Sequence, residues 1–64
     1  MKYPNIDAER ARLDITLEEF SKQLGVSRKT VYNWMNSGNI PQWALVKMSE
    51  LFSKPIDYLL GRLA

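Results

Sequence analysis

Only three residues, Gly25-Val26-Ser27, separate two segments whose apolar residues have helical spacing. The first segment begins with a capping box, in which the Thr16 hydroxyl can cap the amide of Glu19 while the Glu19 carboxylate reaches back. It ends at Gly25, because glycine adopts a positive φ at little cost. Ser27 is a favoured N-cap for the second segment. So short a connection makes the two helices cross closely, and the rest of the chain must pack around this pair.

The residues around the turn meet the other requirements of a close crossing. Ser21 lies inside the first helix and is small enough to let the second helix approach. Apolar side chains are placed to fill the angle between the helices, namely Phe20, Leu24, Val26, Val31 and Trp34. Each feature is weak evidence alone, but all of them share one register. Together they predict a helix-turn-helix.

The remaining segments are also helical in their spacing, and no alternating strand pattern persists. One helix is expected from after Asn5, a good N-cap, to about Leu13, with Ile6, Arg10 and Leu13 on one side. Asp14 follows where the chain needs a left-handed residue. Two further helices are expected to begin near Pro41 and Pro55. Their apolar stripes are Leu45, Met48 and Phe52 in the former, and Ile56, Leu59, Leu60 and Leu63 in the latter.

Composition narrows the possible functions. The 64 residues include no cysteine and no histidine, which removes disulfides, thiolate metal sites and the commonest general base. A carboxylate pair would need a pocket, for which a small helical domain has little room. No apolar run is long enough to span a membrane, and the N-terminus lacks a signal-peptide pattern. We therefore expect one all-α domain over residues 1–64 that is cytoplasmic, not an enzyme, and free of metals and cofactors.

Charge is unevenly distributed along the chain. The first 19 residues hold five acids, whereas the segment 20–49 has no acid and four cations, which are Lys22, Arg28, Lys29 and Lys47. A local positive field of this kind suits a polyanionic partner. On charge alone, an ordinary solvated surface explains the four cations equally well.

The helix after Ser27 separates its side chains into two opposed sides. Val31, Trp34 and Thr30 share one side, with Met35 at the boundary. The other side carries Arg28, Lys29, Tyr32, Asn33 and Asn36. The two cations oppose the helix dipole at this end, and asparagine is a poor mid-helix residue. An anionic partner explains the two cations, and an Asn33 amide that reads adenine through a bidentate pair would compensate for the poor helix former. Tyr32 could also be a solvated residue that packs on its neighbours.

The stretch LEEFSKQLGVSRKTVYNW resembles the helix-turn-helix of the Cro/CI-type regulators, the lambda-repressor-like domains of phage and bacteria. The stretch DYLLG resembles the closing segment of the same family, so the resemblance covers roughly residues 5–61. It implies a compact five-helix lambda-repressor-like domain with the helix-turn-helix at helices 2 and 3. It also implies a transcriptional repressor that binds double-stranded operator DNA, commonly as a homodimer on two-fold related half-sites.

The resemblance also assigns individual residues. It implies base contacts in the major groove from the side chains that the helical wheel selects, namely Arg28, Lys29, Tyr32 and Asn33. It places Ser27 near a phosphate or a thymine methyl, and the amides of Thr16 and Leu17 at a phosphate. Lys22, Asn36 and Asn39 complete the expected contacts to the DNA backbone.

The chain departs from the family pattern at three positions. Leu17 replaces a common glutamine, which puts that side-chain phosphate contact in doubt. Met35 replaces a glutamate that usually pairs with the arginine of helix 1, so Arg10 needs another acceptor. Ser37 stands where glycine is common, with Gly38 next.

A second interpretation keeps the scaffold but changes the partner. In it, the chain is a protein-binding module or an antitoxin. Trp43, a large residue off the core stripe, and the C-terminal apolar stripe would then grip a partner protein. The alternative for Trp43 is a residue that packs at the rim of the core.

Overall fold

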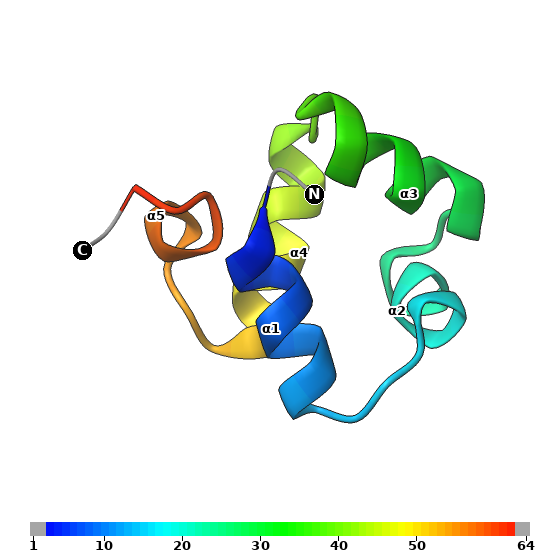
Figure 1. Cartoon of the computed structure of the whole chain (residues 1–64), viewed down its shortest axis with the longest axis horizontal. Helices are drawn as coiled ribbons and strands as arrows, with labels where there is room; N and C mark the ends of the chain where they lie inside the picture. The colour runs from blue at the N-terminus through cyan, green and yellow to red at the C-terminus, as the bar shows by residue number, and fades with distance from the viewer. Residues whose placement is uncertain (1–2, 63–64) are drawn as a thin grey trace.

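The computed structural model describes residues 3–62 and places them in five helices (Figure 1). They are α1 (Pro4–Arg12), α2 (Leu17–Leu24), α3 (Arg28–Ser37), α4 (Gln42–Phe52) and α5 (Ile56–Leu59). Within this range no residue lies in a strand. α2 packs on α3 and α4, while α5 packs on α1 and α4. The predicted all-α fold, with its helix-turn-helix at α2 and α3, is confirmed. Leu63 of the last predicted stripe lies outside the described residues.

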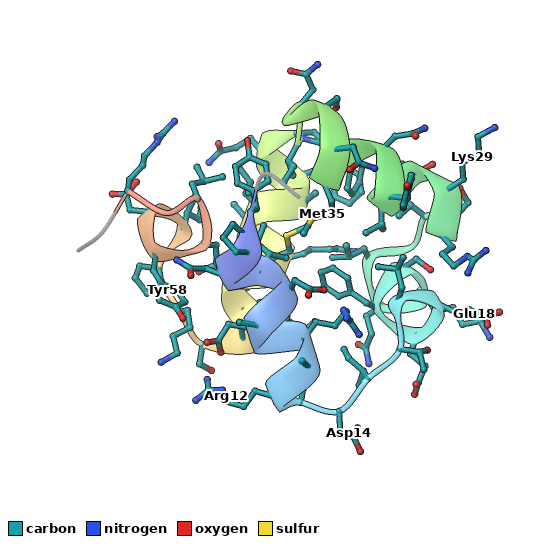
Figure 2. The ribbon with its side chains drawn as sticks, viewed as in Figure 1. Arg12, Asp14, Glu18, Lys29, Met35 and Tyr58 are labelled. Atoms are coloured by element: carbon teal, nitrogen blue, oxygen red, sulfur yellow. The ribbon has the colours of Figure 1, made fainter. Side chains whose placement is uncertain are left out.

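One hydrophobic core draws on all five helices. Phe20 of α2 and Phe52 of α4 stack at its centre, with their ring centroids 5.5 Å apart. Met35, which the helical wheel put at the boundary of α3, points into this core (Figure 2) and is 4% exposed. Each side chain of this size contributes about 1.5–3 kcal/mol when fully buried. The other members of the cluster are Ile6, Leu24, Val31, Met48 and Leu59.

The turn between α2 and α3 has the predicted geometry. Gly25 adopts φ +77°. Its amide donates to the carbonyl of Lys22 at 3.1 Å, and the amide of Val26 donates to the carbonyl of Ser21 at 3.0 Å. This pair of hydrogen bonds is a Schellman motif, which requires a left-handed residue at the helix end. The sequence of the turn therefore fixes how α3 leaves α2.

The ends of α1 differ from the prediction. The helix begins at Pro4 after Tyr3, not after Asn5, since proline in the first turn loses no helical hydrogen bond. Asn5 instead donates from Nδ2 to the Tyr58 carbonyl at 2.7 Å, which ties α1 to α5. Leu13 is 45% exposed and does not share the buried side with Ile6. A smaller shift occurs in α4, which takes Pro41 as its N-cap and begins at Gln42.

Glu9, and not Leu13, is the second buried residue of α1 besides Ile6. It is only 5% exposed and accepts hydrogen bonds from Arg12 and from the Tyr58 hydroxyl, the latter at 3.0 Å. Burial raises the pKa of the Glu9 carboxyl, but the bonds from Arg12 and Tyr58 more than offset it, so the pKa is lowered. The hydrogen bond to this carboxylate raises the pKa of Tyr58. A buried charge thus holds α5 against α1.

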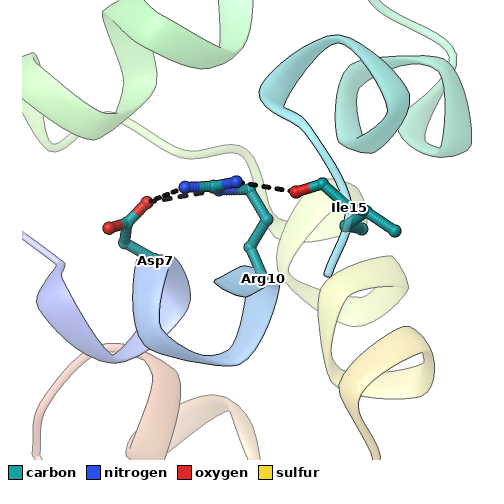
Figure 3. Close-up of polar contacts among 3 residues, drawn as sticks. All are labelled: Asp7, Arg10 and Ile15. Carbon is teal, nitrogen blue, oxygen red and sulfur yellow. Dashed lines mark hydrogen bonds and ion pairs between the residues drawn. The ribbon is translucent and has the colours of Figure 1, made fainter. Parts of the chain in front are cut away.

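Arg10 finds its acceptors on either side of its own position (Figure 3). Its Nη2 donates to Asp7 Oδ1 at 2.8 Å, and its Nη1 donates to the carbonyl of Ile15 at 2.7 Å. The expectation that Arg10 pairs with a group other than residue 35 is confirmed. This arginine holds the segment that leads into α2, and so helps to place the start of the helix-turn-helix.

Candidate nucleic-acid interface

The side of α3 that faces away from the core is exposed to solvent. Tyr32 is 59% exposed, and Lys29 points away from the body of the molecule (Figure 2). On the opposite side of the helix, Val31 and Met35 are buried. The structure therefore gathers the four predicted base-contacting residues on one exposed surface, which we call the α3 face: Arg28, Lys29, Tyr32 and Asn33.

The start of α3 is built to attract an anion. Ser27 is the N-cap, and its Oγ accepts from the Thr30 amide at 3.2 Å and shares a hydrogen bond with Thr30 Oγ1 at 2.9 Å. The first turn holds no acid, so Arg28 and Lys29 add to the positive end of the helix dipole.

The start of α2 lies beside α3 and, unlike the start of α3, carries acidic residues in its first turn. Both halves of the predicted capping box are present, with Thr16 N–H donating to Glu19 Oε1 at 3.0 Å and Glu19 N–H donating to Thr16 Oγ1 at 3.1 Å. These bonds lower the pKa of Glu19, so the carboxylate stays charged and the cap persists at neutral pH. The Thr16 amide is therefore occupied, whereas the amides of Leu17 and Glu18 have no intrahelical partner and remain suited to a phosphate.

Two surface hollows flank the first turn of α3, and Arg28 lines both of them. The first has a volume of about 480 Å³ and is lined by Leu17, Arg28, Lys29 and Tyr32. The second has a volume of about 520 Å³ and is lined by Glu18, Ser21, Lys22, Val26, Ser27 and Arg28. The crossing of α2 and α3 thus brings Leu17 and Lys22 next to the α3 face from either side.

The far end of α3 carries the last two predicted backbone contacts. Asn36 is exposed, and its Nδ2 donates to the Tyr32 carbonyl at 3.1 Å, within the same helix. Asn39 is also exposed, and its amide donates to Ser37 Oγ at 3.3 Å. The positive φ at this helix end, +86°, belongs to Gly38. The loop therefore makes its turn at Gly38, while Ser37 remains the last residue of the helix.

Trp43 lies on α4, outside the core stripe, and is 48% exposed. Its ring meets that of Trp34 edge-on with centroids 5.8 Å apart, and the Lys47 ammonium lies 5.8 Å from its centroid. Trp34 itself is only partly buried and packs against the core from outside. Trp43 thus packs at the rim of the core, and about half of its surface remains exposed.

Sequence spacing did not identify the Leu17 hollow or the Glu9–Tyr58 bond. Both join residues of different helices, and no local pattern signals such contacts. Over residues 3–62 we find no group of acidic residues placed to hold a metal ion. No helix in the same range is long and apolar enough to cross a membrane.

A protein-family model described as Helix-turn-helix matches residues 6–59. The match begins at the first buried residue of α1 and ends at the last residue of α5, so it includes the whole core and both helices of the motif. Comparison with curated proteins and with solved structures gave no match.

Proposed function

Because the chain belongs to the lambda repressor/Cro-like helix-turn-helix family, whose members are DNA-binding transcription regulators, we propose that it is a sequence-specific repressor of the phage or bacterial type. In this proposal residues 1–64 act as one DNA-binding domain on double-stranded operator DNA in the cytoplasm. The observation that carries it is the α3 face, an exposed set of cationic and amide side chains on a helix whose other side is buried.

The α3 face supplies the base contacts in this proposal. An α-helix fits the major groove of B-DNA. The Arg28 guanidinium matches O6 and N7 of guanine, and the Asn33 amide matches N6 and N7 of adenine. Lys29 is a point charge that can contact a base or a phosphate. Tyr32 lies on the same α3 face.

Contacts to the DNA backbone hold the protein in register. At the start of α2, the free amide of Leu17 can donate a hydrogen bond to a phosphate. Lys22, which lines the second hollow, adds a positive charge. The acid at Glu18 opposes a phosphate there, so its neighbours Lys22 and Arg28 have to outweigh it. Thr16, Ser27, Asn36 and Asn39 complete the proposed backbone contacts, with the first two acting mainly through the caps that they form.

Selection of bound sites from random duplex DNA, followed by titration of variants, tests these roles. Arg28→Ala and Asn33→Ala should each cost about 1–3 kcal/mol on the best site and relax preference at one base pair per half-site. Lys22→Ala should weaken binding to all sequences alike and make the salt dependence shallower. Arg62→Ala, which removes an equal charge at the other end of the molecule, is the control. Uniform weakening by Arg28→Ala and Asn33→Ala would mean that α3 does not read sequence.

We further propose that two copies bind one operator as a homodimer, with half-sites about 34 Å apart. Of the members of the predicted C-terminal stripe within residues 3–62, Leu59 is fully buried in the core, while Ile56 of α5 and Leu60, the C-cap of α5, are half-buried. Self-association in the absence of DNA should accordingly be weak. Sedimentation of the free protein and the stoichiometry on a selected site test this proposal. One protomer on a minimal site would contradict it.

A protein partner is the second candidate function, and the exposure of Trp43 and Val46 favours it. Val46 is 40% exposed on the same helix. In this interpretation the chain is an interaction module or antitoxin that uses α4. The two candidates differ in their salt dependence, because counterion release makes DNA binding fall steeply with salt. Tight, salt-insensitive binding to a protein, without DNA binding, would favour the second candidate.

A further inference from the structure

The first of the two hollows beside the α3 face is lined by both charged and apolar side chains. Its volume is about 480 Å³, and its four residues are two cations, Arg28 and Lys29, and two residues with large apolar surfaces, Leu17 and Tyr32. Leu17 and Tyr32 also line a small neighbouring pocket of about 30 Å³ that reaches Phe20 in the core. These two residues therefore lie between the core and the hollow, and their apolar surfaces form part of its wall.

This apolar wall results from the crossing of two helices. Leu17 is the first residue of α2 and is half-buried, whereas Tyr32 lies one turn into α3 and is 59% exposed. Leucine can offer only methyl groups at this position. A polar side chain there would give the hollow a hydrogen-bonding group close to the DNA backbone. In this chain Leu17 gives the hollow an apolar surface, and Arg28 gives it a charged group.

Base edges in the major groove differ in what they present to such a wall. Guanine, adenine and cytosine present hydrogen-bonding groups, and thymine alone adds a methyl group at C5. Placing an amino group against Leu17 without a hydrogen-bond partner would be unfavourable, while burial of a methyl group is favourable. Lys29, which also lines the hollow, can complement a phosphate beside the base. The hollow thus matches a thymine edge in both polarity and charge.

We propose that this hollow is a specificity subsite that contacts the C5 methyl of one thymine in each half-site, with Leu17 and Tyr32 as the contact residues. The proposal rests on the proposed function, because it assigns a base preference within a DNA complex. It adds a determinant on α2 to those on the α3 face, and it makes Leu17 a residue that selects sequence through its side chain.

The test replaces each thymine of the selected site, one at a time, by deoxyuridine, which removes only the methyl group. With the full chain, one such position per half-site should weaken binding about fourfold, the value for one buried methyl group. Changing that pair to C·G should weaken binding further, and 5-methylcytosine at that position should restore part of the loss. These arms separate the methyl group from the rest of the base.

Variants then locate the contact. In Leu17→Gln and Tyr32→Ala the penalty for deoxyuridine should disappear, with folding checked by a thermal melt. Leu13→Ala, which shortens an exposed apolar residue at the end of α1, should keep the penalty of the parent protein. Tight binding that no deoxyuridine weakens, or a penalty that persists in Leu17→Gln, would overturn the subsite and leave the proposed function intact. Failure to bind any duplex would overturn the proposed function itself.

Discussion

Alanine at Gly25 tests how strongly the turn between α2 and α3 depends on its backbone conformation. The residue has φ +77°, and a Cβ atom added to it would meet nothing within 4 Å. Gly25→Ala therefore creates no clash with another residue. Its whole effect must come from the conformation that the Schellman motif imposes, which makes this substitution a clean measure of that conformation.

The magnitude follows from two opposing contributions. An L-residue in the left-handed region costs about 1–2 kcal/mol. Alanine also restricts the unfolded chain, which returns about 0.4–1 kcal/mol. The net loss at Gly25 should be about 1 kcal/mol, and a loss of each kcal/mol should lower the melting temperature of a domain of this size by about 4–8 °C. Gly25→Val should lose more, since a β-branched residue is poorly accommodated at positive φ.

The assay is urea unfolding followed by far-ultraviolet circular dichroism, with an unchanged m-value as the criterion that only stability differs. Gly25→Asn is a graded variant, since asparagine tolerates the left-handed region and should lose less than alanine. Gly61→Ala is the matched control, because its φ is +78° and its added Cβ is also unobstructed. It should cost no more than Gly25→Ala, since α5 is short and can open locally to release strain. A Gly25→Ala protein as stable as the parent would refute the reasoning.

Three further predictions concern stability. Ser53 ends α4 at φ +54°, so Ser53→Gly should stabilise the chain by about 0.5–1 kcal/mol in urea unfolding, and a loss would contradict this. The lowered pKa of Glu9 means that its carboxylate stabilises the fold above the unfolded value near 4.5 and that this contribution disappears as pH falls through the folded value. Glu9→Gln should therefore flatten the profile of unfolding free energy at acid pH, which urea titrations from pH 7 downward would show. Arg10→Ala should lose about 1–2 kcal/mol because it breaks both the pair with Asp7 and the bond to the Ile15 carbonyl, and Arg10→Lys should recover at most half of this in the same assay.

Local chemistry explains why the sequence predicted the helix-turn-helix so fully. The capping box at Thr16 and Glu19, the positive φ at Gly25 and the cap at Ser27 all depend on residues within a few positions of one another. The two-sided pattern of α3 follows from helical periodicity alone. The sequence could therefore place Arg28 and its neighbours on one exposed side before any tertiary contact was known.

Contacts between distant residues decided the rest. Tyr58, 49 residues from Glu9, supplies a hydrogen bond to the buried Glu9 carboxylate that spacing along α1 does not reveal, and Leu13 is exposed instead. Asn5 was expected to cap α1. Its side chain instead donates a hydrogen bond to the carbonyl of the same residue of α5, Tyr58.

Tertiary structure also set the composition of the surface beside the exposed side of α3. Leu17 and Tyr32 share a hollow only because α2 and α3 cross at the angle that the Gly25 turn and the core allow. Sequence by itself determined which residues α3 exposes, since that depends on the period of one helix. Tertiary structure determined which residues of α2 stand beside them, since burial of the shared core fixes where the two helices meet.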